Sequence, residues 1–162
     1  MLAGTPMRRI ADITMEHLAT LKCVGFWRSD REPSLPDPRT LVDETSDSEE
    51  RERVIAYLEA GFYIPVAQGG PSWCRFGCSP RPADIGTQDL TDGTWRFPEG
   101  FVHYVRSHRV KPPAEFLEHM RERSFRVPEW SVLHEKGEPD HCTERGRATA
   151  VSDSDVTGRP RR

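Results

Sequence analysis

The chain has 162 residues, of which 35% are hydrophobic and 30% charged, and this composition fits one globular domain with polar extensions. A formal net charge of −3 argues against a general nucleic-acid binder, which is usually strongly basic. We expect no membrane segment, because no apolar run approaches the length of a membrane helix, and a reducing, cytoplasmic compartment, because four scattered cysteines do not make a secreted disulfide scaffold.

The first predicted element is a helix over residues 6–22, with Thr5 as its N-cap and Pro6 in its first turn, where the missing N–H leaves no hydrogen bond unmade. This helix lies in an N-terminal segment, residues 1–25, that we predict to be appended to the domain. Prolines then interrupt residues 28–47, which excludes a regular helix and predicts an extended strap over the body of the protein.

A second helix is predicted over residues 48–60, because acidic residues crowd its first turn, where the helix dipole favours them, and apolar residues follow at helical spacing. Two capping-box pairs can begin it: Ser46 with Glu49, or Asp47 with Glu50. Gly61 directly follows the helix and suits a left-handed C-terminal cap.

From residue 62 onward the pattern changes to that of short strands. We predict strands over residues 62–67 and 73–78, followed by a hairpin of strands 84–90 and 94–97. The hairpin turns at an Asp-Gly dipeptide, which favours the positive φ angles of a tight turn.

Two further helices are predicted over residues 98–108 and 114–123, separated by a Pro-Pro pair that breaks the chain. Their core-facing side chains are expected to be Phe101, Tyr104, Val105, Phe116, Leu117 and Met120. The expected fold is α+β, with a small antiparallel sheet of 3–4 strands packed against 3–4 helices. This single domain covers residues 26–132, and residues 133–162, which hold almost no large apolar side chain, are predicted to be a disordered tail.

One stretch of the sequence resembles a known group. The segment SWCRFGC…LTDGTWRFPEGFVHYVRSHRVKPPAEF, residues 72–116, is similar to small uncharacterised bacterial proteins from GC-rich genomes with the pattern DG.W.WPEGL.HYV..H.V.LP..F, and residues 26–61 resemble the same group. The resemblance implies one domain ending near residue 127 and no named activity. Where the group has a Cys-x-x-Cys-like spacing this chain has Cys-Arg-Phe-Gly-Cys, and Phe97 stands in place of Trp.

Cys74, Cys78, His103 and His108 are the candidate metal ligands. Two thiolates and two imidazoles complete a tetrahedral shell for zinc, and the spacing within each pair is that of zinc sites. Against this, residues five apart on a regular helix point about 140° away from each other, since each residue turns about 100°. The alternative interpretation is two half-buried cysteines and two surface or capping histidines.

The same residues offer an enzymatic alternative. Cys74 or Cys78 would attack as a thiolate, with His103 or His108 as the general base. The acid that orients the imidazole would be one of Asp84, Asp89, Asp92 and Glu99. No local signature selects among these residues.

Trp73 and Trp95 are candidate anchors of a binding groove, with Arg75 and Arg96 as neighbouring polar contacts. Alternate strand positions must be apolar for a sheet to bury one face. The alternative is therefore that the aromatic residues of this stretch form the core.

The sequence contains no nucleotide-binding loop, no carboxylate pair at a readable spacing and no catalytic-triad signature. We therefore expect a non-enzymatic protein that binds a protein partner, of the immunity or regulatory kind. The alternatives are a zinc-stabilised Cys2His2 binding module and, third, a Cys/His-dependent enzyme. Zinc is the one cofactor to which the residues point, and neither the partner nor the oligomeric state can be predicted.

Overall fold

The structure is a computed structural model that describes residues 13–64, 72–78, 81 and 84–129. Four α-helices pack with a four-stranded mixed sheet, which confirms the α+β prediction. The predicted disordered tail lies outside the described residues. In the part of the chain that is described, no helix combines the length and the apolar character needed to cross a bilayer.

The sheet has the strand order β1-β4-β3-β2. Its strands are β1 (Lys22–Cys23), β2 (Phe62–Tyr63), β3 (Asp89–Thr91) and β4 (Trp95–Pro98). β2, β3 and β4 pair antiparallel, as predicted. β1 runs parallel to β4, so the sheet is mixed rather than purely antiparallel.

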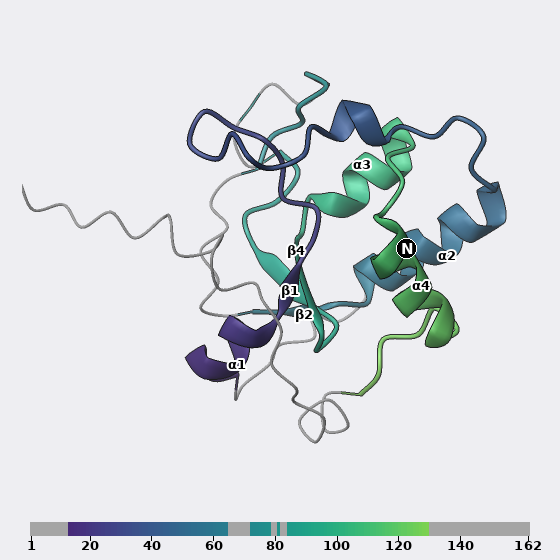
Figure 1. Cartoon of the computed structure of the whole chain (residues 1–162). Helices are drawn as coiled ribbons and strands as arrows, with labels where there is room; N and C mark the ends of the chain where they lie inside the picture. Colours follow the sequence, from purple (N-terminus) through teal and green to yellow (C-terminus); the bar gives the residue numbers. More distant parts are fainter. Residues whose placement is uncertain (1–12, 65–71, 79–80, 82–83, 130–162) are drawn as a thin grey trace, which may run out of the picture.

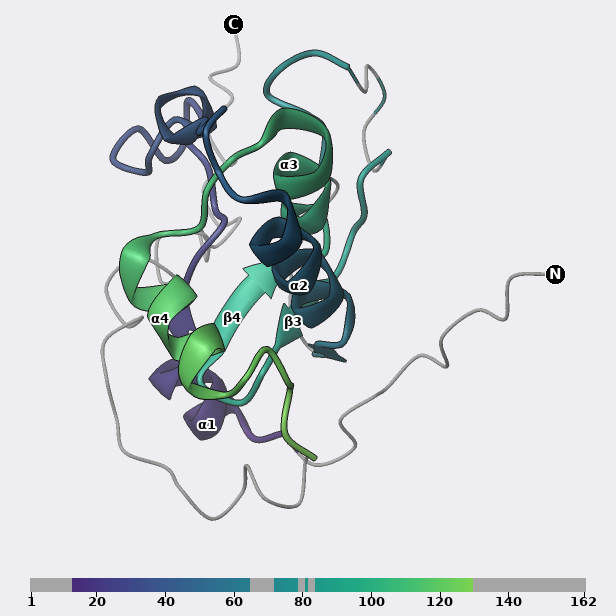
Figure 2. The ribbon, with the colours of Figure 1, turned by 90° about the vertical axis from the view of Figure 1, so that its right-hand side faces the viewer.

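Three helices cover one face of this sheet: α2 (Ser48–Glu59), α3 (Phe101–His108) and α4 (Ala114–Glu122). In Figure 2 α2 and α4 lie in front of β3 and β4, and α3 lies above these strands. The short helix α1 (Met15–Thr20) lies on the other side of the strands from α2 and α4, at the lower left of Figure 1. The strap between β1 and α2 has no α-helix, as its prolines predict, and contains one 3-10 turn, Pro38–Leu41.

The helix α2 begins where its sequence predicts. The side chain of Asp47 accepts hydrogen bonds from the backbone N–H groups of Glu49 and Glu50, so Asp47 and not Ser46 is the N-cap. The prediction of a left-handed Gly61 is wrong, because φ at Gly61 is not positive. A Cβ atom at Gly61 would lie 3.0 Å from the ring of Phe97, so this glycine allows the helix end to pack closely on the sheet.

The core forms between the sheet and these helices. Phe97 of β4, Phe101 of α3 and Phe116 of α4 are fully buried. The ring centroid of Phe116 lies 5.9 Å from that of Phe97 and 6.3 Å from that of Tyr57 on α2. All six side chains predicted to face the core from α3 and α4 are buried, which confirms the helical periodicity.

Three predicted elements are wrong in part or in whole, and one of them is the strand predicted over residues 84–90, which begins only at Asp89. The helix predicted over residues 6–22 is the six-residue α1, capped by Thr14, whose hydroxyl accepts a hydrogen bond from the N–H of His17 at 3.1 Å. Its predicted beginning lies outside the described residues, and its predicted end is β1, because Lys22–Cys23 pairs with β4. The segment 73–78, predicted as a strand, is a turn.

Candidate metal centre

Local hydrogen bonds shape the turn at residues 72–78. The N–H of Gly77 donates to the carbonyl of Cys74 at 3.0 Å, and the N–H of Phe76 lies 3.4 Å from the Cys74 Sγ. Gly77 has a φ of +81°, a region that glycine enters without steric cost. These features reverse the chain between Cys74 and Cys78 and bring the two sulfur atoms together, which a strand would not do.

Tyr104 fixes the turn over the helix α3. Its hydroxyl accepts a hydrogen bond from the N–H of Arg75 at 3.0 Å and donates to the carbonyl of Trp73 at 3.2 Å. The rest of the Tyr104 side chain is buried in the core. The backbone next to Cys74 is therefore tied to a rigid position on α3.

His103 and His108 flank Tyr104 on the same helix. A rotation of about 100° per residue places Tyr104 about 100° and His108 about 140° from His103, so Tyr104 and the turn above it lie between the two histidines. The two imidazole centroids are 5.1 Å apart. The expectation that this spacing separates the imidazoles is therefore wrong. The two side chains leave the helix about 140° apart, but each covers part of that angle and the rings come close together.

The four candidate ligand atoms all lie within 4.8 Å of one another. The His108 Nε2 is 3.2 Å from the Cys74 Sγ and 3.1 Å from the Cys78 Sγ, and the His103 Nε2 is 3.2 Å from the Cys78 Sγ. Bonds of about 2.3 Å to sulfur and about 2.0 Å to nitrogen in a tetrahedral zinc site separate these atoms by about 3.5 Å. These three pairs would need shifts of only a few tenths of an ångström to hold a metal ion, whereas atoms as far apart as 4.8 Å would have to approach by about 1 Å.

The protonation states of these residues suit a metal site. Burial lowers the pKa of His103, with further contributions from His108 and Arg106, and burial also lowers the pKa of His108, so both imidazoles are neutral at pH 7. Desolvation, and then the neighbouring Cys74 thiol, raises the pKa of Cys78. A divalent cation would lower the pKa of Cys78 instead, because it attracts the thiolate form. Two thiolates balance its two positive charges, so the buried centre would carry no net charge.

A metal ion held by all four residues would have a closed coordination shell. Four protein ligands fill a tetrahedral shell and leave no open position for a substrate or a reactive water. Cys74 is buried, Cys78 is exposed, and His103 and His108 are half-buried, so the centre lies where the turn meets the body of the protein.

The acids needed for the enzymatic alternative are engaged elsewhere in the described part of the chain. Three of them contact groups other than the two histidines: Asp84 the N–H of Arg81, Asp89 the guanidinium of Arg96, and Glu99 the hydroxyl of Tyr63. No hydrogen bond among the described residues joins any of these carboxylates to His103 or His108. The geometry therefore does not support a catalytic triad at this site.

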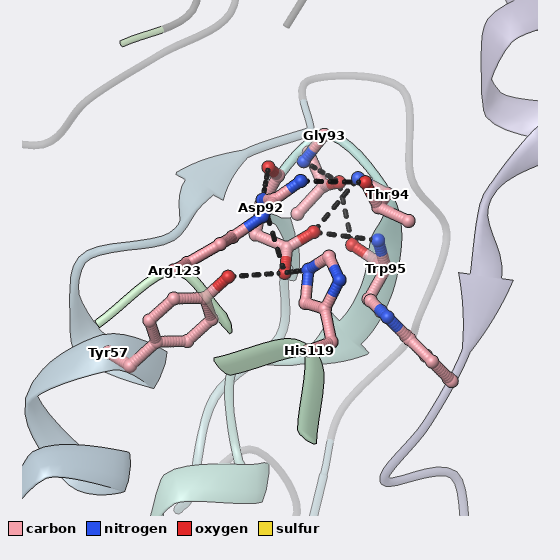
Figure 3. Close-up of polar contacts among 8 residues, drawn as sticks. Tyr57, Asp92, Gly93, Thr94, Trp95, His119 and Arg123 are labelled. Atoms are coloured by element: carbon pink, nitrogen blue, oxygen red, sulfur yellow. Dashed lines mark hydrogen bonds and ion pairs between the residues drawn. The ribbon is translucent and has the colours of Figure 1, made fainter. Parts of the chain in front are cut away.

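Asp92, the fourth acid, lies at the centre of a second polar cluster that we did not predict (Figure 3). Its Oδ1 accepts hydrogen bonds from the backbone N–H groups of Thr94 at 2.8 Å and Trp95 at 2.7 Å. Its Oδ2 accepts one from the Tyr57 hydroxyl at 2.7 Å and lies 2.9 Å from the His119 Nε2. The carboxylate is fully buried, and these contacts use all of its acceptor sites.

Arg123 completes the Asp92 cluster by donating to the Asp92 backbone carbonyl at 3.1 Å (Figure 3). Burial raises the pKa of Asp92, but the hydrogen bond from His119 and those from its other neighbours outweigh burial, so this pKa lies below its ordinary value. Burial and the Asp92 charge raise the pKa of Tyr57. We assign the cluster to the fold, where it joins α2, the β3–β4 turn and α4, because its carboxylate has no acceptor site left for a ligand.

The four predicted binding residues lie in different surroundings. Trp73 is 46% exposed, and the guanidinium carbon of Arg75 lies 4.5 Å from its ring centroid. Trp95 is buried in the core, and Arg96 pairs with the buried Asp89 at 2.8 Å. Trp73 and Arg75 are therefore surface candidates beside the metal centre, whereas the position of Trp95 fits the alternative interpretation as a core residue.

Comparison with known proteins gives no relative: no protein-family model, no curated protein and no solved structure matches the chain.

Proposed function

We propose that the protein is a zinc-stabilised module that works by binding a partner rather than by catalysis. The observation that carries this proposal is the convergence of Cys74, Cys78, His103 and His108, from two separate segments, to within 4.8 Å. Tetrahedral sets of two sulfur and two nitrogen ligands are typical of zinc, and a closed shell is typical of a structural site.

A metal ion would add to the contacts with Tyr104 that hold the turn. Cys74 is the only buried residue in the segment 72–78. Apolar burial alone therefore contributes little to holding the turn against α3. A zinc ion that bridges the turn and the helix adds binding free energy directly to this part of the fold.

The proposed binding function rests on the surface that the turn presents. Trp73 is a large exposed aromatic residue, and its neighbour Arg75 packs over its ring. Trp and Arg are the residue types that most often anchor protein interfaces. In this proposal the metal ion holds both side chains in a fixed position for a partner.

Metal analysis of the full chain purified without a histidine tag tests the proposal. We expect one zinc ion per chain, lost in Cys78→Ser and retained in Ser107→Ala, an exposed control on α3. Cobalt substituted for zinc should give the visible absorption of a tetrahedral thiolate site. Protein that binds no zinc at micromolar concentration, or zinc that is retained in Cys78→Ser, would overturn the proposal.

A further inference from the structure

A cavity of about 440 Å³ lies between the strap and the turn of the metal centre. Three arginines line it, Arg28 and Arg39 from the strap and Arg75 from the turn. Two aspartates, Asp30 and Asp37, also line it. The cavity therefore holds an excess of positive charge in a protein whose net charge is −3.

Two of these guanidinium groups form hydrogen bonds only through their Nε atoms, and that of Arg75 also packs over the Trp73 ring. The Arg28 Nε donates to the carbonyl of Pro33 at 2.9 Å, and the Arg75 Nε donates to the carbonyl of Arg28 at 3.3 Å. Within the described part of the chain, the terminal nitrogens of Arg28 and Arg75 have no hydrogen-bond partner, and neither residue forms an ion pair. Each side chain is thus oriented in advance while its two terminal NH2 groups remain available.

Arg39 plays a different role from the other two arginines. It lies 3.5 Å from the carboxylate of Asp37, which neutralises its charge, and its other terminal nitrogen donates to the carbonyl of Arg75. Arg39 therefore braces the strap against the turn. The charges that remain are those of Arg28 and Arg75, opposed by that of Asp30.

We propose that this cavity binds a phosphate monoester group carried by a partner polypeptide. Such a group bears a charge of about −1.5 to −2 at pH 7 and offers three acceptor oxygens. These oxygens can accept hydrogen bonds from the terminal NH2 groups of both Arg28 and Arg75. A carboxylate or a phosphodiester bears only one negative charge, and the acidic balance of the chain disfavours a nucleic-acid polyanion. The inference rests on the proposed function, because the metal-bound turn places Arg75 in the cavity wall.

Calorimetric titration of the zinc-loaded full chain tests the inference. The ligands are a short phosphoserine peptide, its unphosphorylated form, inorganic phosphate and a short single-stranded oligonucleotide. We expect saturable one-to-one binding of the phosphopeptide and none of the unphosphorylated form. Phosphopeptide binding that is tighter than that of inorganic phosphate assigns the group to a polypeptide, and equal binding assigns the same cavity to a small phosphate compound. Tighter binding of the oligonucleotide would overturn the proposal.

Substitutions in the cavity have expected effects of opposite sign. Arg28→Gln and Arg75→Gln should each weaken phosphopeptide binding by roughly tenfold or more, because each removes charge-assisted hydrogen bonds. Asp30→Asn should strengthen binding, because it removes the opposing charge. The matched control is Arg31→Gln, an exposed arginine outside the cavity, which should bind as the wild type does. Equal affinities of Arg28→Gln and Arg31→Gln would overturn the proposal.

Arg28 separates this inference from the zinc proposal, because it lies outside the metal-bound turn. Arg28→Gln should keep its full zinc content. Stoichiometric zinc without Arg28-dependent phosphate binding would overturn the inference and leave the zinc module standing. Arg28-dependent phosphate binding by a chain that holds no zinc would overturn the zinc module and leave the phosphate-binding cavity standing.

Discussion

Phe76 lies flat against the imidazole of His108, with their ring centroids 4.1 Å apart and their planes inclined by 4°. This stack fixes the ring so that the His108 Nε2 faces both thiols, at 3.2 Å from the Cys74 Sγ and 3.1 Å from the Cys78 Sγ. Residues that orient a metal ligand typically change metal affinity when they are replaced, although they do not touch the ion. In the proposed zinc module, Phe76 would be such a positioning residue.

Phe76→Ala is therefore expected to weaken zinc binding by about tenfold while leaving a stoichiometry of one zinc per chain at saturation. Competition with a chromophoric chelator measures the affinity. Phe26→Ala, which removes a half-buried aromatic ring that lies over Arg96 and not beside the metal centre, is the control and should match the wild type. Wild-type affinity in Phe76→Ala would mean that the stack does not orient His108.

Gly77 allows a test of the turn that leaves all four ligands in place. Its φ is +81°, and a Cβ atom there would meet no other atom within 4 Å, so a substitution strains only the backbone. Gly77→Val should cost about 1–2 kcal/mol in the turn and weaken zinc binding about tenfold. Gly77→Asn should stay within a few-fold of wild type, because Asn tolerates the left-handed region. Equal zinc affinities of the two variants would contradict a left-handed residue in the metal-bound turn.

Much of the fold could be predicted because its determinants are local. Asp47 caps α2 within its own first turn, and the Asp-Gly dipeptide turns the β3–β4 hairpin with Gly93 at a φ of 93°. The segment 73–78 could not be predicted in this way. Its alternation of residue types fits a strand, but Tyr104, about thirty positions along the chain, holds its backbone in a turn through two hydrogen bonds.

The candidate site, like the fold, could be predicted from the sequence only in part. Cysteine and histidine point to metal chemistry by residue type alone, so the four ligand candidates were predicted. Their convergence was left open, because helix geometry considered without the overlying turn sets His103 and His108 about 140° apart. The Asp92 cluster carries no local signal, since Tyr57, Asp92 and His119 come from three separate elements.

Removal of the metal is expected to loosen one end of the molecule and not the whole. The turn at 72–78 buries only Cys74, whereas α2 and α4 are held by the core residues Tyr57 and Phe116. Hydrogen exchange after chelation should therefore accelerate in the turn and at the end of α3, with little change in α2 and α4. Uniform acceleration throughout the chain would contradict this division, and unchanged exchange in the turn would show that the metal does not hold it.

Asp92→Asn is expected to destabilise the protein by about 3–5 kcal/mol, because the amide cannot serve both the Tyr57 hydroxyl and His119 as the carboxylate does. Urea unfolding at pH 7 measures the loss. The control Glu122→Gln removes an exposed carboxylate from α4 and should change the free energy of unfolding by no more than about 0.5 kcal/mol. Equal stabilities of the two variants would mean that the Asp92 cluster does not stabilise the fold.

The stabilisation by Asp92 should also depend on pH in a definite direction. Burial raises the pKa of Asp92, but its hydrogen bonds outweigh burial and hold this pKa below the ordinary value. A carboxyl whose pKa is lower in the folded state contributes stability above its unfolded pKa of about 3.9 and loses it as the pH falls through the folded pKa. With both proteins free of metal, the difference in unfolding free energy between wild type and Asp92→Asn should be present at about pH 5 and shrink below about pH 4. Groups that titrate in both proteins and do not contact residue 92, such as Asp89, whose pKa is raised by burial, cancel in this difference, whereas His119, which contacts the Asp92 carboxylate, does not. A difference that does not shrink below about pH 4 would show that Asp92 is not charged in the native state.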